Sequence, residues 1–530
     1  MIKGDYKKYR VGRYFSLSLV ALFVAGLLAA CGDNTAAPTT AATTAAAAAT
    51  TAASATTAAA ATTAAAATTA AAATTAAGAT SAAATTAAGA TSAAATTAAG
   101  GTATTAAATT AAGGTATTAA AGGTGSTLAL PANCSNVQLA YWNGFTGPDG
   151  PFMGQIVDAF NKENSGKITV KMTSQADYNT QLTTAAASDT LPDIIIVNED
   201  VVASFAFNNI IRPIDPIVQQ LGYTASDFPK IAWDNGMVAG KRYTLPLSMV
   251  PMTMFYNNDM LKAAGISAPP TNDAEFQKAA AAMTKGGNHG FEITSGFPVQ
   301  QIFQELLHQY GGSEFNADVS QATWNSDAGV KAMQWMLDAQ KKYAEPALEV
   351  DADINSFKAG SAGMIWNGIW QTTNVTGSKA VSFDGKATAT PQIGTQPGTW
   401  AGMASLGLPV HKKGNDACKD AASGLLMKYI LDNSLTWAKA GNVPAYNTVR
   451  NSADIAALHP QAELAKAVEN PIFPPSVPGI GDAFGPLSDA VTALMTGKAT
   501  DVKKALDDAA AKSNQTLAAN KAKYGDAPKS

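Results

Sequence analysis

The sequence predicts an α/β fold for the last three quarters of this 530-residue chain. Strand and helix patterns alternate from residue 137 onward, which is typical of a doubly wound sheet. One strand is an unbroken Ile/Val run, as expected where helices cover both faces of a parallel sheet. The globular part spans about 400 residues, enough for two lobes with sizeable cores.

The first strands and helices follow in quick succession. "VQLAYW" (137–142) is typical of a buried strand, and "GPFMGQIVDAFNKEN" (150–164) has apolar residues at helical spacing. "KITVKM" (167–172) and "PDIIIVN" (192–198) predict the second and third strands. Ligands of such sheets bind beyond the carboxyl ends of the strands, so we expect binding at the loops "NGFTGPDG" and "NEDVVAS".

The later segments continue the mixture. "KRYTLPLSMVPMTMFYNNDMLKAAGI" (241–266) predicts two extended segments and a helix. In "TNDAEFQKAAAAMTK" we expect a helix with Thr271 as N-cap and Ala274 in place of the capping-box Glu. "SAGMIWNGIW" (361–370) predicts a short strand that runs into a loop. Further helices are expected in "VQQIFQELLHQYGG", "AGVKAMQWMLDAQKKY", "DACKDAASGLLMKYILDN" and around 485–520.

The N-terminal residues have the pattern of a secretory signal. Five basic residues precede the apolar stretch from Leu17 to Ala30. "LAAC" (28–31) matches the bacterial lipobox, whose cysteine carries diacylglycerol. We therefore expect a signal peptide at 1–30 and a lipid on Cys31 that anchors the chain to the membrane. The alternative is a simple signal that Cys31 happens to follow.

Residues 31–132 predict a disordered, Ala/Thr-rich linker. From 35 to 126 the chain has no charged or aromatic residue, so it cannot bury enough surface to offset the entropy of ordering. A flexible coil of this length spans about 50 Å, which would lift a domain off a lipid surface.

Charge and cysteine content limit the partners. Removing the signal peptide leaves 30 of the 35 basic and 38 of the 39 acidic residues, a net charge of about −8, which argues against nucleic-acid binding. Besides Cys31, only Cys134 and Cys418 remain, and they form either one disulfide or two buried free thiols. The four histidines are scattered without the close pairs of zinc sites, so no metal and no cofactor is expected.

Five phrases of the globular part resemble family 1 extracellular solute-binding proteins of ABC importers, the group that contains maltose-binding protein. They are "YWNGFTGPDGPFMGQIVDAFN", "LPDIIIVNED", "GKRYTLPLSMVPMTMFYNNDMLKAAGI", "FKAGSAGMIWNGIW" and "LMTGKATDVKKALDDA", in the order of the family. The resemblance implies two α/β lobes joined by a hinge, which close on a ligand like a clamp. One lobe would take 133–247 with 399–445, and the other 248–398 with 446–530. Cys134 and Cys418 would then share a lobe, which favours the disulfide.

The function that the resemblance implies is transport rather than catalysis. A carbohydrate would bind between the lobes of a monomeric, lipid-anchored extracytoplasmic protein, and an ABC permease would receive it. The main alternative is a lipid-anchored glycoside hydrolase, which needs two carboxyl groups on either side of the scissile bond. The best acids, Glu199 and Asp200, are instead neighbours in one loop. A passive surface module would explain the linker but not the hinge phrases.

A sugar site needs aromatic rings for the C–H face of the sugar and carboxylates or amides for its hydroxyls. Trp370 and Phe484 match stacking positions of the family, although maltose-binding protein has Trp in place of the Phe. Asp200 matches a carboxylate that binds sugar hydroxyls, and Glu199 is in reserve. The other candidates are Asn367 beside Trp370, Asn143, Phe145 and Thr146 in the first loop with Asp149 as a weaker one, Gln300 and Gln301, Ser248 after the hinge, and Trp400 at the return crossing.

The remaining tryptophans have other expected roles. Trp335 and Trp437 lie on apolar helix faces and are expected in the core, while Trp233 and Trp324 are expected to be structural. Trp366 belongs to either the core or the cleft. Val197 and Val201 stand where maltose-binding protein has an aromatic and a basic sugar contact. A mono- or oligosaccharide other than maltose, or a polyol derivative, therefore fits as well.

Overall fold

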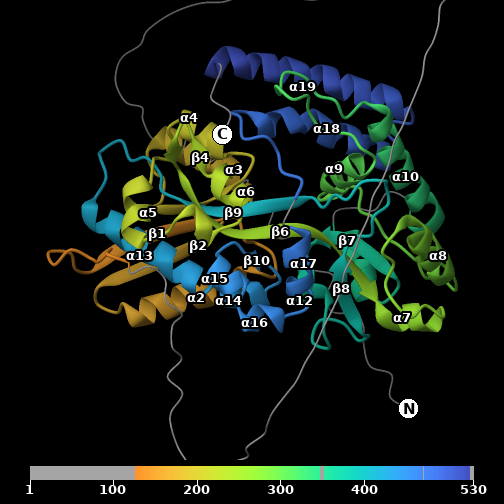
Figure 1. Ribbon diagram of the computed structural model, residues 1–530, viewed down its shortest axis with the longest axis horizontal. Coiled ribbons are helices and arrows are strands. Elements are labelled where there is room, and N and C mark those ends of the chain that lie inside the picture. The colour runs from red at the N-terminus through yellow and green to blue at the C-terminus, as the bar shows by residue number, and fades with distance from the viewer. Residues whose placement is uncertain (1–125, 346–350, 469–470, 526–530) are drawn as a thin grey trace, which may run out of the picture. The chain divides into compact units, whose positions relative to one another are not determined.

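The computed structural model describes residues 126–345, 351–468 and 471–525 (Figure 1). The predicted signal peptide, the lipidation candidate Cys31 and the linker up to residue 125 lie outside the described residues. Within the described ranges, no helix is both long and apolar enough to span a bilayer.

Three parallel strands form one side of the main sheet, as the sequence predicts. They are β1 (Val137–Asn143), β2 (Ile168–Ser174) and β3 (Ile194–Asn198). β1 lies in the middle and pairs in parallel with both neighbours. Four of the five residues of β3 are buried, which confirms the strand covered on both faces. Because the strands are parallel, their carboxyl ends lie at the same edge of the sheet.

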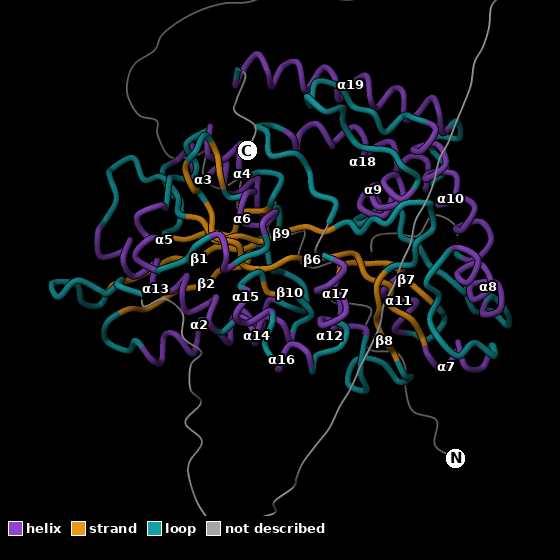
Figure 2. Tube along the Cα trace, in the orientation of Figure 1, coloured by secondary structure: helices purple, strands orange, loops and turns teal. Residues whose placement is uncertain are grey.

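Two strands, the short β5 (Lys241–Arg242) and the long β6 (Thr244–Asn257), form where two extended segments were predicted, and β6 is the longer element. Its first part pairs with β9 (Ala401–Gly407), and its second part pairs with β7 (Met364–Gly368) and β8 (Gly385–Ala389). The sheet order is β10-β6-β9-β3-β1-β2, with β7 and β8 on the far part of β6. Figure 2 shows β6 and β9 running between the two groups of strands. We call the part with β1 to β3 the first lobe and the part with β7 and β8 the second lobe.

Buried apolar residues form separate cores in the two lobes. The first core draws on residues between 134 and 247 and between 404 and 446. The second draws mainly on residues between 252 and 366 and between 480 and 517. A small cluster around Met249, Ala401 and Met403 lies where β6 and β9 cross from one lobe to the other. This is a mixed α/β fold with two lobes, and its lobe boundaries stay a prediction.

Helices and short strands complete the two lobes. Those that follow β1 to β3 and return after β9 are α2 (Gly150–Glu163), α3 (Tyr178–Ser188), α4 (Val202–Phe207), α5 (Asp215–Leu221), η1 (Ala225–Asp227), α6 (Lys230–Asn235), β4 (Met237–Val238), β5 (Lys241–Arg242), α13 (Ala417–Asp432), α14 (Ser434–Lys439) and β10 (Val443–Pro444). Those between β6 and β9 are α7 (Asn258–Ala263), α8 (Asp273–Met283), α9 (Val299–Gln309), α10 (Asp327–Tyr343), α11 (Ala352–Lys358), η2 (Ile369–Gln371) and α12 (Thr372–Val375). The chain ends with α15 (Asn447–Arg450), α16 (Ala453–Ala456), α17 (Gln461–Ala467), α18 (Ile480–Met495) and α19 (Val502–Tyr524).

The N-cap expected at Thr271 is wrong by one residue. Asn272 is the N-cap of α8, and its side chain accepts a hydrogen bond from the backbone N–H of Glu275. Glu275 in turn accepts hydrogen bonds from the backbone N–H and hydroxyl of Thr271. With Asn272 as the cap, Glu275 occupies the third helical position, where a carboxylate can reach back past the helix start.

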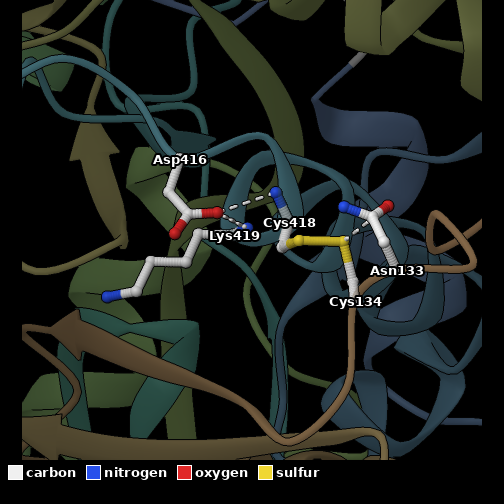
Figure 3. The surroundings of a disulfide bond; sticks show 5 residues. All are labelled: Asn133, Cys134, Asp416, Cys418 and Lys419. Carbon is white, nitrogen blue, oxygen red and sulfur yellow. Dashed lines mark hydrogen bonds between the residues drawn. A yellow bond between two sulfur atoms is a disulfide. The ribbon is translucent and has the colours of Figure 1, made fainter.

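A disulfide joins Cys134, just before β1, to Cys418 in the first turn of α13 (Figure 3). It is the first of the two alternatives that the sequence left open, and both cysteines belong to the first lobe. The last residues of the predicted linker, 126–132, contact the same lobe. The backbone N–H groups of Thr127 and Leu128 donate to the carbonyl of Gln220 in α5. Leu128 also packs over Gly424 of α13, because a Cβ there would lie 2.5 Å from its side chain. Leu128 and Leu130 are large apolar residues, which the Ala/Thr repeats before them lack.

Candidate functional site

The carboxyl ends of β1 and β3 open into a cavity of about 340 Å³ in the first lobe. Its lining residues are Gly144, Phe145, Asp177, Tyr178, Asn179, Thr180, Ile196 and Asn198. The Tyr178 hydroxyl contacts the backbone carbonyls of Trp142 and Ile196, and it accepts a hydrogen bond from Ile196 N–H. This tyrosine therefore ties the ends of the two strands together beneath the cavity, at the edge where the sequence predicts binding.

Of the first-loop candidates Asn143, Phe145 and Thr146, only Phe145 lines this cavity. Asn143 is fully buried, and its Oδ1 accepts hydrogen bonds from Phe145 N–H at 3.0 Å and from Ser174 Oγ at 2.8 Å. It therefore shapes the loop on which Phe145 lines the cavity, whereas Thr146 is exposed. The weaker candidate Asp149 is buried.

A larger cavity of about 920 Å³ is lined by residues of both lobes. Asn179 and Thr180 line both cavities, and Asp200 from the first lobe faces Gly481 and Asp482 of α18. A Cβ on Gly481 would lie 3.1 Å from Asp200 Oδ2. The glycine therefore lets the carboxylate approach the start of α18.

The lobes touch through residues that line the larger cavity, among them Ser204, Asn208 and Tyr524. Gly479 N–H donates to Ser204 Oγ at 2.7 Å, and Asn208 Nδ2 donates to the Tyr524 hydroxyl at 3.0 Å. Both contacts join α4 or its C-cap to the C-terminal helices of the second lobe. A solute in this cavity would therefore contact groups from both lobes.

Two buried carboxylates, one from each lobe, hold the return crossing of the chain. Glu199 Oε2 accepts Met403 N–H at 2.7 Å, and Glu305 Oε2 accepts Trp400 N–H at 2.8 Å. Glu305 also accepts the Thr390 hydroxyl. Burial raises the pKa of Glu305 to about 7, and burial together with the Asp200 charge raises the pKa of Glu199. Burial also raises the pKa of Asp200.

We expect the free energy of unfolding to fall as the pH rises between the ordinary pKa of Glu305 and its pKa in the fold. Its ordinary pKa is 4.5 and its pKa in the fold is about 7, so between these values only the native state holds the proton. The free energy of unfolding then falls by up to about 1.4 kcal/mol per pH unit from this group. Glu305→Gln removes the titration while its amide oxygen can still accept Trp400 N–H.

Thermal unfolding between pH 5 and 8 checks this expectation. The melting temperature of the Glu305→Gln variant should fall less steeply with pH than that of the natural chain. The exposed Glu163→Gln serves as the control for removal of one carboxylate. Parallel profiles for the natural chain and Glu305→Gln would contradict the expectation.

Aromatic side chains gather near the start of α9 in the second lobe. Trp370 lies in η2, just after β7, and its ring stacks on Phe297 with centroids 5.7 Å apart and planes 21° apart. Phe297 is 58% exposed and is the only large exposed apolar side chain among the described residues. A Cβ on Gly368 would lie 2.0 Å from the Trp370 ring, so only glycine leaves room for the ring there. The sequence reasoning missed Phe297, although a large apolar residue between Gly and Pro ahead of a helix was a visible signal.

The other second-lobe candidates divide into partly exposed and buried residues. Gln300 and Gln301 lie in the first turn of α9, next to Phe297, and Gln301 Oε1 is buried without a hydrogen-bond partner in the described part of the chain. Asn367 is only 2% exposed and donates to Asp353 Oδ2. Trp400, 8% exposed, packs with the second core.

Two placements do not support the predicted ligand contacts. Ser248 is fully buried in β6, where its hydroxyl accepts a hydrogen bond from Trp437 Nε1. Phe484 packs edge-on against Phe315 in the second core, with centroids 5.1 Å apart. The core roles expected for Trp335 and Trp437 are confirmed, and Trp366 and Trp324 are also buried. Trp233 stacks on Phe228.

No group of three or more His, Cys, Asp or Glu in the ranges that the structure describes could hold a metal ion. The groups that could bind a solute are the polar linings of the two cavities and, near the start of α9, two amides and the exposed Phe297 stacked on the half-buried Trp370. Such a surface can bind a neutral polar solute that has an apolar face.

Comparisons with known proteins agree with this picture. The family of bacterial extracellular solute-binding proteins matches residues 145–447. A protein of Brucella abortus (strain 2308), provisionally named as a binding protein, is 26% identical over 257 residues. This match covers 45% of the chain and 59% of the relative, so the chain spans about three fifths of the length of that relative.

Solved structures share the fold. An ABC substrate-binding protein from Listeria monocytogenes in complex with cycloalternan is 21% identical, with a TM-score of 0.62 over 72% of this chain and 99% of that one. The maltose/maltodextrin-binding domain MalE from Bdellovibrio bacteriovorus, bound to maltotriose, is 20% identical, with a TM-score of 0.63 over 72% of this chain and all of that one. With more than half of its residues matched, the chain belongs to the family of bacterial extracellular solute-binding proteins.

Proposed function

We propose that this protein is the lipid-anchored solute-binding component of an ABC importer, and that it captures a carbohydrate between its two lobes and delivers it to a membrane permease. The proposal rests above all on one observation. The exposed Phe297, stacked on the half-buried Trp370, lies in a member of a solute-binding family, in a fold whose lobes share two crossing strands.

A carbohydrate fits the chemistry of these surfaces. The C–H face of a sugar ring packs on aromatic rings, and its hydroxyls need donors and acceptors that would otherwise be left unpaired on closure. The aromatic pair offers rings for the C–H face of the sugar. Asp200, Gln301 and the amides around Asn179 offer donors and acceptors for its hydroxyls. The solved proteins of the same fold with cycloalternan and maltotriose give this class of solute further support.

Closure follows from the way the lobes are joined. A solute that contacts both lobes binds the closed state better than the open one and so shifts the equilibrium toward closure. The lipid on Cys31 and the linker would keep this clamp near its importer at the outer side of the membrane. The permease would then recognise the closed form.

The alternative function, a glycoside hydrolase, gains no support from Glu199 and Asp200 of the first lobe. Glu199 is nearly buried and its carboxylate accepts Met403 N–H, so one of the two acids is committed to the backbone. A hydrolase would need both carboxyl groups free to flank a glycosidic bond.

A thermal-shift screen tests the proposal. The purified protein is heated with mono-, di- and oligosaccharides, polyols and glycerol phosphodiesters. We expect a saturable rise in melting temperature with a carbohydrate, of the size that mass action gives for ligand well above its Kd. A rise with only the phosphodiesters, or with no compound, would contradict carbohydrate as the cargo.

A further inference from the structure

The aromatic residue Trp370 stands beyond the end of a strand, where sheet pairing no longer fixes the backbone. Asn367 and Gly368 are the last residues of β7, and they pair with Thr253 and Met252 of β6. Trp370 follows in the short 3₁₀ turn η2. Its orientation therefore depends on side-chain contacts around residues 367 to 369.

Asp353 of α11 supplies one of these contacts. It lies in the first turn of α11 and is 1% exposed. Its Oδ2 accepts a hydrogen bond from Asn367 Nδ2 at 3.0 Å. The other end of the same amide, Asn367 Oδ1, accepts Gly368 N–H at 2.9 Å. With the amide nitrogen bound to Asp353, the amide oxygen is directed at the backbone of Gly368.

Gly368 in turn is in direct contact with the indole of Trp370. The absence of a side chain at Gly368 leaves the space that the Trp370 ring fills, since a Cβ there would lie 2.0 Å from the ring atoms. The ring then stacks on the exposed Phe297. The order of contacts is Asp353, Asn367, Gly368 and Trp370.

We propose that Asp353 is a positioning residue for ligand binding, which acts through Asn367 and the Gly368 backbone to hold the Trp370 ring against Phe297. This inference rests on the proposed carbohydrate site at Trp370. Asp353 itself is too buried to touch a solute. A carboxylate accepts a stronger hydrogen bond from the Asn367 amide than a neutral oxygen would. This bond is also short-range and directional, as positioning requires.

The burial of this carboxylate supports the assignment. Burial raises the pKa of Asp353 to about 6, while the hydrogen bond from Asn367 lowers it. A buried acid costs free energy that an apolar residue at the same place would avoid. The Asn367 amide is the side-chain partner that the fold gives it in return.

A second anchor makes the test informative. Ile369 is fully buried, and its carbonyl accepts a hydrogen bond from the Thr372 hydroxyl at 2.6 Å. If the hydrogen bond at Ile369 alone fixes the conformation of η2, Asp353 contributes only to the stability of the fold. If Asp353 positions the ring, its loss must be felt at Trp370 in particular.

The first experiment needs no ligand. The protein is labelled with 5-fluorotryptophan, and the Trp370 resonance is assigned with Trp370→Phe. Asp353→Ala should shift or broaden the Trp370 resonance and leave those of Trp437 and Trp233 in place. Asp353→Asn, which keeps an oxygen acceptor for Asn367, should restore the natural spectrum in large part. The exposed Asp508→Ala is the control for loss of an acid in the second lobe.

Asn367→Ala removes the middle contact and keeps the test valid if Asp353→Ala does not fold. It should change the same resonance. An unchanged Trp370 resonance in both folded variants, or equal changes at all the tryptophans, would overturn the inference. Because this experiment uses the protein alone, its result is independent of whether a carbohydrate binds.

The second experiment measures coupling in binding. With the carbohydrate found by the thermal-shift screen, Asp353→Ala should weaken the affinity about tenfold in the natural chain and have almost no further effect in the Trp370→Ala background. An equal loss in both backgrounds would overturn a role through Trp370. Absence of any carbohydrate binding by the natural chain would instead reject the proposed function and leave the resonance test to decide the inference.

Discussion

Replacing Trp370 with alanine should weaken carbohydrate binding by roughly 30- to 100-fold. A tryptophan in contact with a ligand is a typical hot spot, whose truncation costs about 2 kcal/mol or more, and every 1.4 kcal/mol is tenfold in Kd. The half-buried ring of Trp370 stacks on Phe297, and its loss removes this ring contact. Titration calorimetry with the solute from the screen measures the change.

Trp370→Phe is the matched control for this prediction. It keeps a planar apolar ring and should lose only part of the affinity. The unliganded melting temperature should change little in either variant, because the ring is not part of a core cluster. An alanine variant that binds as tightly as the natural chain would show that Trp370 is not a ligand contact.

Removing the disulfide should produce the largest loss of stability. Cys134 and Cys418 are 284 residues apart in sequence, so the bond closes a very long loop in the unfolded chain. In the chain-entropy model such a loop is worth about 5.6 kcal/mol. If about 400 residues unfold together, this loss lowers the melting temperature by about 7 °C.

Differential scanning calorimetry of the natural chain with and without reductant measures the effect. The double variant Cys134→Ser/Cys418→Ser should melt at the same temperature as the natural chain with reductant. Its own melting temperature should not change when reductant is added. This behaviour separates the bond itself from any other action of the reductant. Equal melting temperatures for oxidised and reduced chains would contradict the prediction.

The sequence predicts the local elements well where one pattern dominates. β3 is an Ile/Val run, and it lies buried in the parallel part of the sheet as predicted. The binding edge follows from strand direction alone, and a cavity lies there. The disulfide was an open alternative, because spacing along the chain does not say whether two cysteines meet in space.

The site residues are harder to predict because they depend on partners far away in sequence. Glu199 and Glu305 bind backbone groups 204 and 95 residues away, which no local pattern reveals. The period of two along β6 says which residues share a face of the strand, but not that Trp437 covers Ser248.

Phe484 shows a signal that was available in the sequence. Ile480, Ala483, Phe484 and Leu487 are spaced as one apolar helix face, and the structure buries all four in the second core. Helical spacing therefore favoured the core over the cleft. Phe297 shows a different case, since it lies outside any periodic pattern. Its place between Gly296 and Pro298 ahead of a helix was the signal in the sequence, and its exposure in the fold shows that it is accessible.

The central claim is that this chain carries a solute and does not transform it. The most direct test is titration calorimetry of the purified protein with the best carbohydrate of the screen, followed by mass spectrometry of the sugar recovered from the complex. The account predicts saturable binding of one sugar per chain and recovery of the sugar intact. Cleaved sugar, or no saturable binding of any carbohydrate, would contradict it.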